Sequence, residues 1–171
     1  MGDVSLKSLK IGAGAASRDI AVRIREGRPP GLFWLGGFKS DMKGTKAAAL
    51  DLWAATQGRA CTRFDYSGHG ESGGDFADGT ISRWLEESVA VFGHFCRGPQ
   101  IVIGSSMGGW MALLLARELN RLAKADRPSV ALGSGISTPR RARETTSRLG
   151  IKAATNPLGR WKIGASKGTG R

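Results

Sequence analysis

The stretch GPQIVIGSSMGGWMALLLAREL, residues 98–119, constrains the fold of this 171-residue chain more than any other. It begins with a short apolar run, residues 101–104, of the type that forms a strand buried on both faces. A helical pattern starts at Met107, directly after two serines. Glycines lie two positions before and after Ser106, where small residues let a strand and the following helix approach closely. The stretch therefore predicts a strand, a sharp turn that carries Ser106, and a helix.

Strand-like and helix-like patterns also alternate before this stretch. Residues 19–26 alternate apolar and polar side chains, and residues 31–36 are a short apolar run separated from them by Pro29 and Pro30. A helical pattern follows, with Ser40 or Asp41 as its cap and Gly58 at its end. Two further elements are expected: a strand over residues 59–66 and a helix from about residue 80.

This alternation predicts an α/β fold in which helices cover both faces of a parallel sheet. Ligand sites in such sheets collect at the carboxyl ends of the strands. The predicted strands end at three glycine-containing loops: GGFKSDMKG, DYSGHGESGG and GSSMG. We therefore expect the functional site to form where these loops meet.

The net charge of +12 belongs to the C-terminal end of the chain. Residues 1–120 hold 14 Lys and Arg against 12 Asp and Glu, whereas residues 121–171 hold 12 against 2. From residue 127 on, Gly, Ser, Thr, Lys and Arg are scattered without a strand or helix period. We predict three segments: an N-terminal segment over 1–18, a partial α/β domain over 19–126, and a basic, poorly structured tail over 127–171.

Several protein classes are disfavoured by the sequence. No apolar run approaches the ~20 residues that a transmembrane helix needs. The N-terminus lacks the apolar core of a secretory signal, and Leu6 stands where a myristoylation signal requires Ser or Thr. Cys61 and Cys96 lie in apolar surroundings without metal-site spacing, which favours free thiols in a reducing compartment. We therefore expect a cytoplasmic protein without a membrane span, with a weak organellar presequence as the alternative.

Ser106 is the candidate nucleophile. A G-x-S-x-G turn between a strand and a helix projects the serine hydroxyl above the sheet. The backbone N–H of Met107, at the helix start, is placed to stabilise an oxyanion. A second oxyanion donor should come from the loop after the preceding central strand, where the N–H of Phe38 is the candidate. A serine-rich turn that only caps the helix is the alternative interpretation.

On these motifs the chain resembles the α/β-hydrolases over about residues 19–120. LGGF stands where many members have an oxyanion motif, with Gly36 in place of a histidine; DYSGHGESGG matches the loop after the next strand, and GSSMGGW matches the nucleophile elbow. The combination is most similar to bacterial relatives of the mitochondrial palmitoyl-protein thioesterase that also cleaves acyl glucuronides. The resemblance implies a serine hydrolase of small-molecule carboxylic esters or thioesters, with no metal or organic cofactor. Ser106 would attack the acyl carbon, a histidine would take its proton, and an acid would orient the histidine.

The expected base is missing from its usual place. The family places its acid and then its histidine after the nucleophile, but no histidine follows Ser106. His69 lies in the glycine-rich loop, where the family has a structural residue, and His94 lies late on a predicted helix. The last two carboxylates are Asp126, which comes too early, and Glu144. Without triad partners, activity should fall on the order of 10⁴-fold or more.

We interpret the change of composition as a truncation or frameshift after about residue 120. A catalytically inactive binding module, and an enzyme whose base is His69 or comes from another chain, are the alternatives. A basic extension that binds nucleic acid is disfavoured, because Trp161 is the only aromatic residue of the tail. An unpaired sheet edge predicts self-association. Asp41, Lys43 and Gly44 either shape the site or only form a cap and surface charges.

Overall fold

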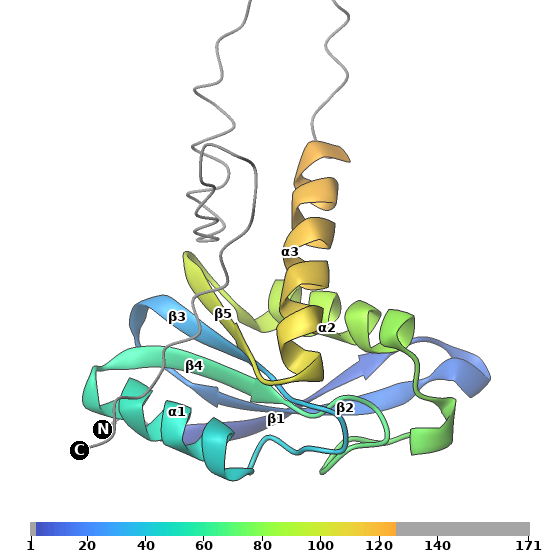
Figure 1. The fold of residues 1–171 in the computed structure, drawn as a ribbon, viewed down its shortest axis with the longest axis horizontal. Helices are drawn as coiled ribbons and strands as arrows, with labels where there is room; N and C mark the ends of the chain where they lie inside the picture. The colour runs from blue at the N-terminus through green and yellow to red at the C-terminus, as the bar shows by residue number, and fades with distance from the viewer. Residues whose placement is uncertain (1–2, 126–171) are drawn as a thin grey trace, which may run out of the picture.

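The computed structural model describes residues 3–125, which form one five-stranded sheet with helices on both faces (Figure 1). The strands are β1 (Val4–Ile11), β2 (Arg18–Arg25), β3 (Arg28–Leu35), β4 (Arg59–Phe64) and β5 (Gln100–Gly104). The helices are α1 (Thr45–Thr56), α2 (Ile81–Phe95) and α3 (Met107–Ala125), with short 3₁₀ helices at Gly14–Ala16 and Phe76–Asp78. The expected α/β class with helices on both faces is confirmed.

The strand order is β1-β2-β4-β3-β5, and the sheet is mixed rather than parallel throughout. β3 is parallel to both β4 and β5, so Leu32 lies opposite Cys61 on one side and Ile101 on the other. β2 is antiparallel to β1 and to β4. A parallel connection needs a crossover of a dozen or more residues. The short links on either side of β2 carry no α-helix, so the chain reverses direction there.

Two details at element ends differ from the sequence prediction. Pro29 and Pro30 lie inside β3 instead of separating two strands. They are tolerated because the pairing of β3 with β4 is interrupted between Arg28 and Leu32. α1 begins at Thr45, with Gly44 as its cap and no side-chain capping bond, so neither Ser40 nor Asp41 caps it.

The main hydrophobic core lies between the sheet and the layer formed by α2 and α3, while α1 covers the other face (Figure 1). Along β3, Phe33 and Leu35 point into the main core, whereas Leu32 packs with Cys61 and Ala54 on the α1 side. α3 contributes the buried residues Met111, Leu115 and Leu119, which lie one helical turn apart. Burying each large apolar side chain stabilises the fold by about 1.5–3 kcal/mol. Within residues 3–125 no helix is long and apolar enough to cross a bilayer.

Candidate active site

The nucleophile candidate lies on a sharp turn between β5 and α3. The backbone of Ser106 has φ of 55°, a left-handed conformation that non-glycine residues rarely adopt. Its side chain lies at the surface, and the Gly109 N–H donates a 2.8 Å bond to its carbonyl oxygen. A strained conformation of this kind is typical of functional sites and costs about 1–3 kcal/mol. The turn has the geometry that the G-x-S-x-G motif predicts.

The glycines around Ser106 allow α3 to pack directly on the sheet. A Cβ atom on Gly104 would collide with the carbonyl of Gly108. A Cβ atom on Gly108 would collide with the carbonyl of Leu35 and would lie 2.6 Å from that of Gly36. Larger residues at these positions would therefore push the start of α3, and Ser106 with it, away from β3.

The loop after β3 lies beside the nucleophile turn. The Ser105 N–H donates a 3.2 Å bond to the Leu35 carbonyl, and a Cβ atom on Gly37 would lie 3.6 Å from the Ser106 Cβ. Within residues 3–125, neither the Phe38 N–H nor the Met107 N–H donates a hydrogen bond. The Phe38 amide lies in the loop after β3, and the Met107 amide lies at the first residue of α3, directly after Ser106. The arrangement leaves two donors available for an oxyanion.

The rest of this loop packs on aromatic side chains, and one lysine from the loop and one from α1 lie nearby. The Phe38 ring is 56% exposed and lies 5.2 Å from the Phe76 ring, edge to face. The Lys39 ammonium lies 5.2 Å from the Phe76 ring centroid, within cation–π range. Lys46, in the first turn of α1, donates a 3.1 Å bond to the Ser105 hydroxyl. Ser105 is therefore engaged with Lys46, and the neighbouring Ser106 is not.

A cavity of about 390 Å³ lies between the loops that follow β3 and β4. Its wall consists of residues 39–41 on one side and of Gly68, His69, Gly70 and Phe76 on the other. Because β3, β4 and β5 are parallel, the loops after β3 and β4 lie at the same edge of the sheet as the turn after β5 that carries Ser106.

The three residues left open by the sequence form a cap-like turn and surface charges. The Asp41 carboxylate accepts a 2.7 Å bond from the Lys43 N–H, and the Gly44 N–H donates to the Asp41 carbonyl. Lys43 pairs with Glu71 at 3.1 Å. Asp41 also lines the cavity, so it alone of the three faces the candidate site.

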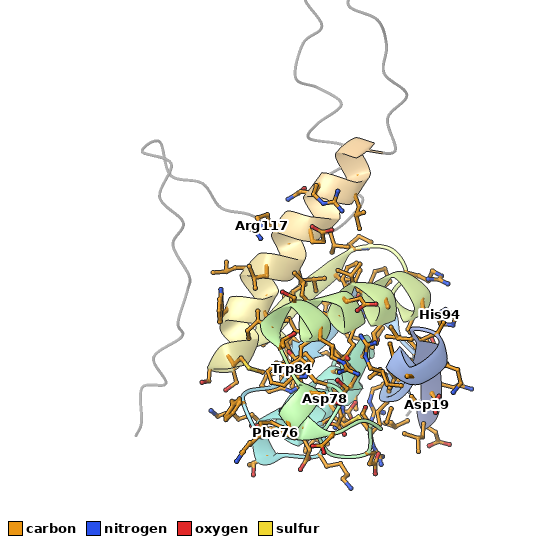
Figure 2. The ribbon with its side chains drawn as sticks, turned by 90° about the vertical axis from the view of Figure 1, so that its right-hand side faces the viewer. Asp19, Phe76, Asp78, Trp84, His94 and Arg117 are labelled. Carbon is orange, nitrogen blue, oxygen red and sulfur yellow. The ribbon has the colours of Figure 1, made fainter. Side chains whose placement is uncertain are left out.

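Neither histidine of the chain is placed like a catalytic base. His69 is buried, with its Nδ1 3.2 Å from the Ser67 carbonyl and its Nε2 3.3 Å from the Lys39 N–H. His94 is exposed in the last turn of α2 and packs against Phe95. Trp84 in the first turn and His94 in the last lie at opposite ends of α2 (Figure 2). The chain enters β5 from the His94 end, whereas Ser106 follows the other end of β5.

Asp65 is a buried carboxylate that the sequence analysis did not single out. It is 1% exposed, and it accepts a 2.6 Å bond from the Met42 N–H and a 2.8 Å bond from the Glu71 N–H. Burial raises the pKa of the Asp65 carboxyl, and the two backbone bonds oppose this effect. Asp65 thus links the loop after β3 to the loop after β4.

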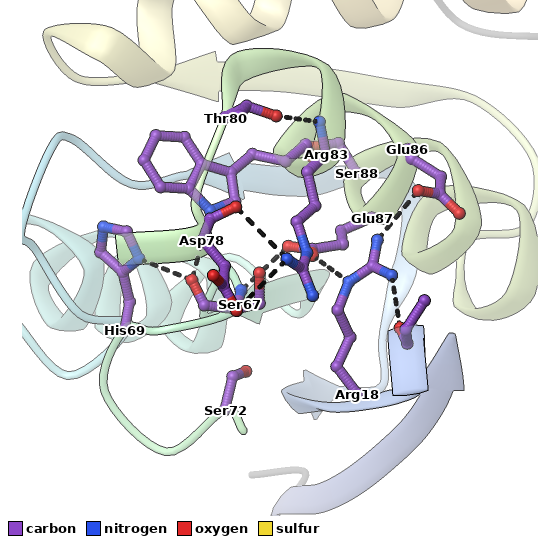
Figure 3. A network of polar contacts seen from close by, with 12 residues as sticks. Arg18, Ser67, His69, Ser72, Asp78, Thr80, Arg83, Glu86, Glu87 and Ser88 are labelled. Atoms are coloured by element: carbon purple, nitrogen blue, oxygen red, sulfur yellow. Dashed lines mark hydrogen bonds and ion pairs between the residues drawn. The ribbon is translucent and has the colours of Figure 1, made fainter. Parts of the chain in front are cut away.

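Glu87 is a second buried carboxylate and lies at the centre of the network in Figure 3. It is fully buried on α2, where it receives the Arg18 guanidinium and a 2.9 Å bond from the Ser67 N–H. Arg18 also pairs with Glu86 at 2.9 Å. Arg18 and Glu87 are 69 positions apart in the chain, so no local sequence pattern indicates that they pair. The network supports the loop after β4 rather than facing Ser106.

Metal-binding side chains are not gathered in the part of the chain that the structure describes. No three His, Cys, Asp or Glu side chains there could hold one ion. The carboxylates Asp126 and Glu144, like the predicted tail, lie outside the described residues.

Comparisons with known proteins agree with this geometry. In humans, "Palmitoyl-protein thioesterase ABHD10, mitochondrial" is 39% identical over 95 residues, which cover 56% of this chain and 31% of that protein. A putative hydrolase from Agrobacterium vitis S4 has a similar structure, with a TM-score of 0.68, 37% identity, and coverage of 91% of this chain and 66% of that one. Mouse alpha/beta hydrolase domain-containing protein 10 gives a TM-score of 0.61 at 34% identity, covering 71% and 46%.

The chain spans about a third of the length of the curated mammalian relatives that it matches. The model of the alpha/beta hydrolase family matches residues 29–167, which is most of the chain and extends past residue 126, where the predicted domain ends. With the strand–turn–helix geometry at Ser106 and these relatives, this match shows that the chain belongs to the alpha/beta hydrolase family.

Proposed function

We propose that the site around Ser106 hydrolyses carboxylic esters or thioesters through an acyl-enzyme. The observation that carries this proposal is the strained backbone of Ser106, which holds an exposed serine near two backbone amides, Phe38 and Met107, that donate no hydrogen bond within residues 3–125. The mammalian relatives are named as palmitoyl-protein thioesterases, which supports an acyl substrate.

The chemistry follows from this arrangement. The Ser106 hydroxyl oxygen forms a bond to the acyl carbon, and the carbonyl oxygen becomes an oxyanion between the N–H groups of Phe38 and Met107. The bond to the alcohol or thiol then breaks, and that group leaves with a proton. Water attacks the acyl-enzyme in the second half of the reaction and releases the acid. Each oxyanion donor contributes on the order of 10²- to 10³-fold in rate.

The proton of Ser106 has no histidine acceptor at hand. The ring nitrogens of His69 face Ser67 and Lys39, and His94 lies at the opposite end of β5. We therefore expect the 171-residue chain to acylate slowly, on the order of 10⁴-fold or more below an intact triad. A catalytically inactive binding module, with the same cavity and elbow, is the second candidate function, and the placement of the histidines favours it.

A fluorophosphonate probe tests the proposal on the full chain, because it reacts with an activated serine. We expect a slow adduct on Ser106, located by peptide mass spectrometry and absent in Ser106→Ala. Ser105→Ala is the matched control, since Ser105 is the adjacent serine and is bonded to Lys46. Slow hydrolysis of p-nitrophenyl butyrate and of a palmitoyl thioester should likewise be lost in Ser106→Ala and kept in Ser105→Ala. No adduct on Ser106 after prolonged exposure, or an equal adduct on Ser105, would favour the binding module.

Partners and location stay predictions. A small acyl ester or thioester is the proposed ligand, and nothing in the proposal requires nucleic acid. Ile101 of β5 and Trp110 and Leu113 of α3 are exposed apolar side chains in the described part of the chain, which supports self-association. Size-exclusion chromatography with light scattering would test it. The predicted cytoplasmic location contrasts with the word "mitochondrial" in the names of the relatives.

A further inference from the structure

His69 joins the two loops on either side of the candidate cavity. Its Nδ1 lies 3.2 Å from the Ser67 carbonyl oxygen, and its Nε2 lies 3.3 Å from the backbone nitrogen of Lys39. An amide nitrogen only donates and a carbonyl only accepts, so Nε2 accepts from Lys39 and the proton resides on Nδ1. The neutral imidazole thus uses both nitrogens to hold one loop against the other.

The anchor on the β4 side is rigid. The Ser67 carbonyl that binds His69 also accepts a 3.2 Å bond from the Trp84 indole N–H. The Ser67 N–H is bonded to Glu87, whose carboxylate receives the buried Arg18 guanidinium (Figure 3). The His69 ring also packs edge to face against the rings of Phe76 and Trp84, each with a centroid 5.1 Å away. The imidazole therefore has little freedom to turn.

The backbone that His69 holds is strained. Lys39 has φ of 54°, although lysine has no preference for left-handed backbone. The N–H that His69 binds belongs to the peptide unit between Phe38 and Lys39. The hydrogen bond to His69 therefore fixes the orientation of that peptide unit, and with it the backbone of Phe38. The Phe38 N–H is the proposed oxyanion donor, and it comes from the preceding peptide unit. A turn of Phe38 by a few tens of degrees would move that donor away from Ser106.

We propose that His69 is a positioning residue of the oxyanion hole. It holds Lys39 in its left-handed conformation and so aims the Phe38 N–H at the acyl oxygen bound at Ser106. This inference rests on the proposed function at Ser106. It also assigns His69 a role other than that of the general base, because both nitrogens are engaged away from the nucleophile.

Three variants of the full chain test the proposal. His69→Phe keeps an aromatic ring in the packed position but removes both bonding nitrogens. His69→Gln keeps an acceptor and a donor at a similar reach, but an amide is not a general base. His94→Phe is the matched control, because His94 is the other histidine of the chain and is exposed on α2. Thermal melting shows which variants remain folded.

The first measurement is hydrogen–deuterium exchange, read by mass spectrometry of peptides that cover residues 36–44. We expect His69→Phe to speed exchange in this loop at least tenfold, while peptides from β2 and β4 stay unchanged. The second is the rate of fluorophosphonate labelling at Ser106, which should fall on the order of 10²-fold, the cost of a displaced donor. His69→Gln should return exchange nearly to the rate of the parent chain and labelling to within about tenfold of it, and His94→Phe should change neither.

The outcomes distinguish a failure of the proposed reaction at Ser106 from a failure of the positioning role of His69. If the parent chain never labels at Ser106, the proposed reaction is wrong, whereas loop exchange still decides the positioning role of His69. Unchanged exchange at 36–44 in folded His69→Phe overturns the inference. Labelling in His69→Gln as low as in His69→Phe, with a protected loop, would instead identify His69 as the base.

Discussion

Two adjacent glycines of α3 give a direct test of how closely this helix packs on the sheet. In Gly108→Ala, the new Cβ would lie 2.6 Å from the Gly36 carbonyl oxygen and closer still to that of Leu35. An ordinary contact starts at 3.4 Å, so the start of α3 must withdraw by 0.8 Å to relieve the Gly36 contact and by more to relieve the closer Leu35 contact. In Gly109→Ala, the nearest atom is the Gly104 carbonyl oxygen at 3.8 Å, which is an ordinary contact.

The two variants should therefore change stability in opposite directions. Overpacking costs about 1–3 kcal/mol, and the higher helix propensity of alanine returns up to about 1 kcal/mol. We expect the free energy of unfolding to fall by about 2 kcal/mol in Gly108→Ala, and to rise by about 0.5–1 kcal/mol in Gly109→Ala. Urea titration followed by tryptophan fluorescence measures both values. Equal changes in the two variants would refute the argument, because helix propensity alone would then explain them.

Four further predictions concern individual side chains. Ser106→Gly should be about 1 kcal/mol more stable to urea than Ser106→Ala, since glycine adopts positive φ without strain; equal midpoints would argue against strain at the elbow. Arg18→Ala should lower the free energy of unfolding by about 3–5 kcal/mol, because it leaves the Glu87 carboxylate buried without its cation, and a loss below 1 kcal/mol would contradict this. Burial raises the pKa of Cys61 to about 11 and of Cys96 to about 12, so iodoacetamide at pH 8 should alkylate both at least about 100-fold more slowly in the native chain than in urea. The same shifts predict stability that is complete below pH 9 and is lost as the pH rises through 11 to 12, which pH-dependent melting would show.

The sequence predicted those parts of the fold whose signal is local. The apolar run of β5 and the helix after it were located from residues 98–119, and the class of fold followed from the alternation of strands and helices. β1 was not predicted: its sequence, VSLKSLKI, alternates only in part, and half of its side chains are exposed at the sheet edge. The direction of β2 was missed because pairing partners far apart in the sequence, not its own residues, decide it.

The residues of the site divide in the same way, into those marked by a local motif and those that depend on distant partners. Ser106 could be found because its neighbours Gly104 and Gly108 are part of one short motif. Asp65 and Glu87 could not be found, because a carboxylate that binds backbone N–H groups or a distant arginine looks like any surface acid in the sequence. Such residues are recognised only when burial and the partner are known together.

The strained backbone conformations of Ser106 and Lys39 are held in place in two different ways. In residues 3–125, Lys39 and Ser106 are the non-glycine residues with positive φ; Ser106 lies near Gly37, and Lys39 follows Gly37 by two positions in the same loop. At Ser106 the strain is maintained by α3, which can pack on β3 only because the flanking glycines lack side chains. At Lys39 no glycine pattern marks the position, and the conformation depends on a side chain from another loop, His69. A motif can therefore reveal the first strained residue, whereas the second is found only by asking which buried group holds an improbable backbone in place.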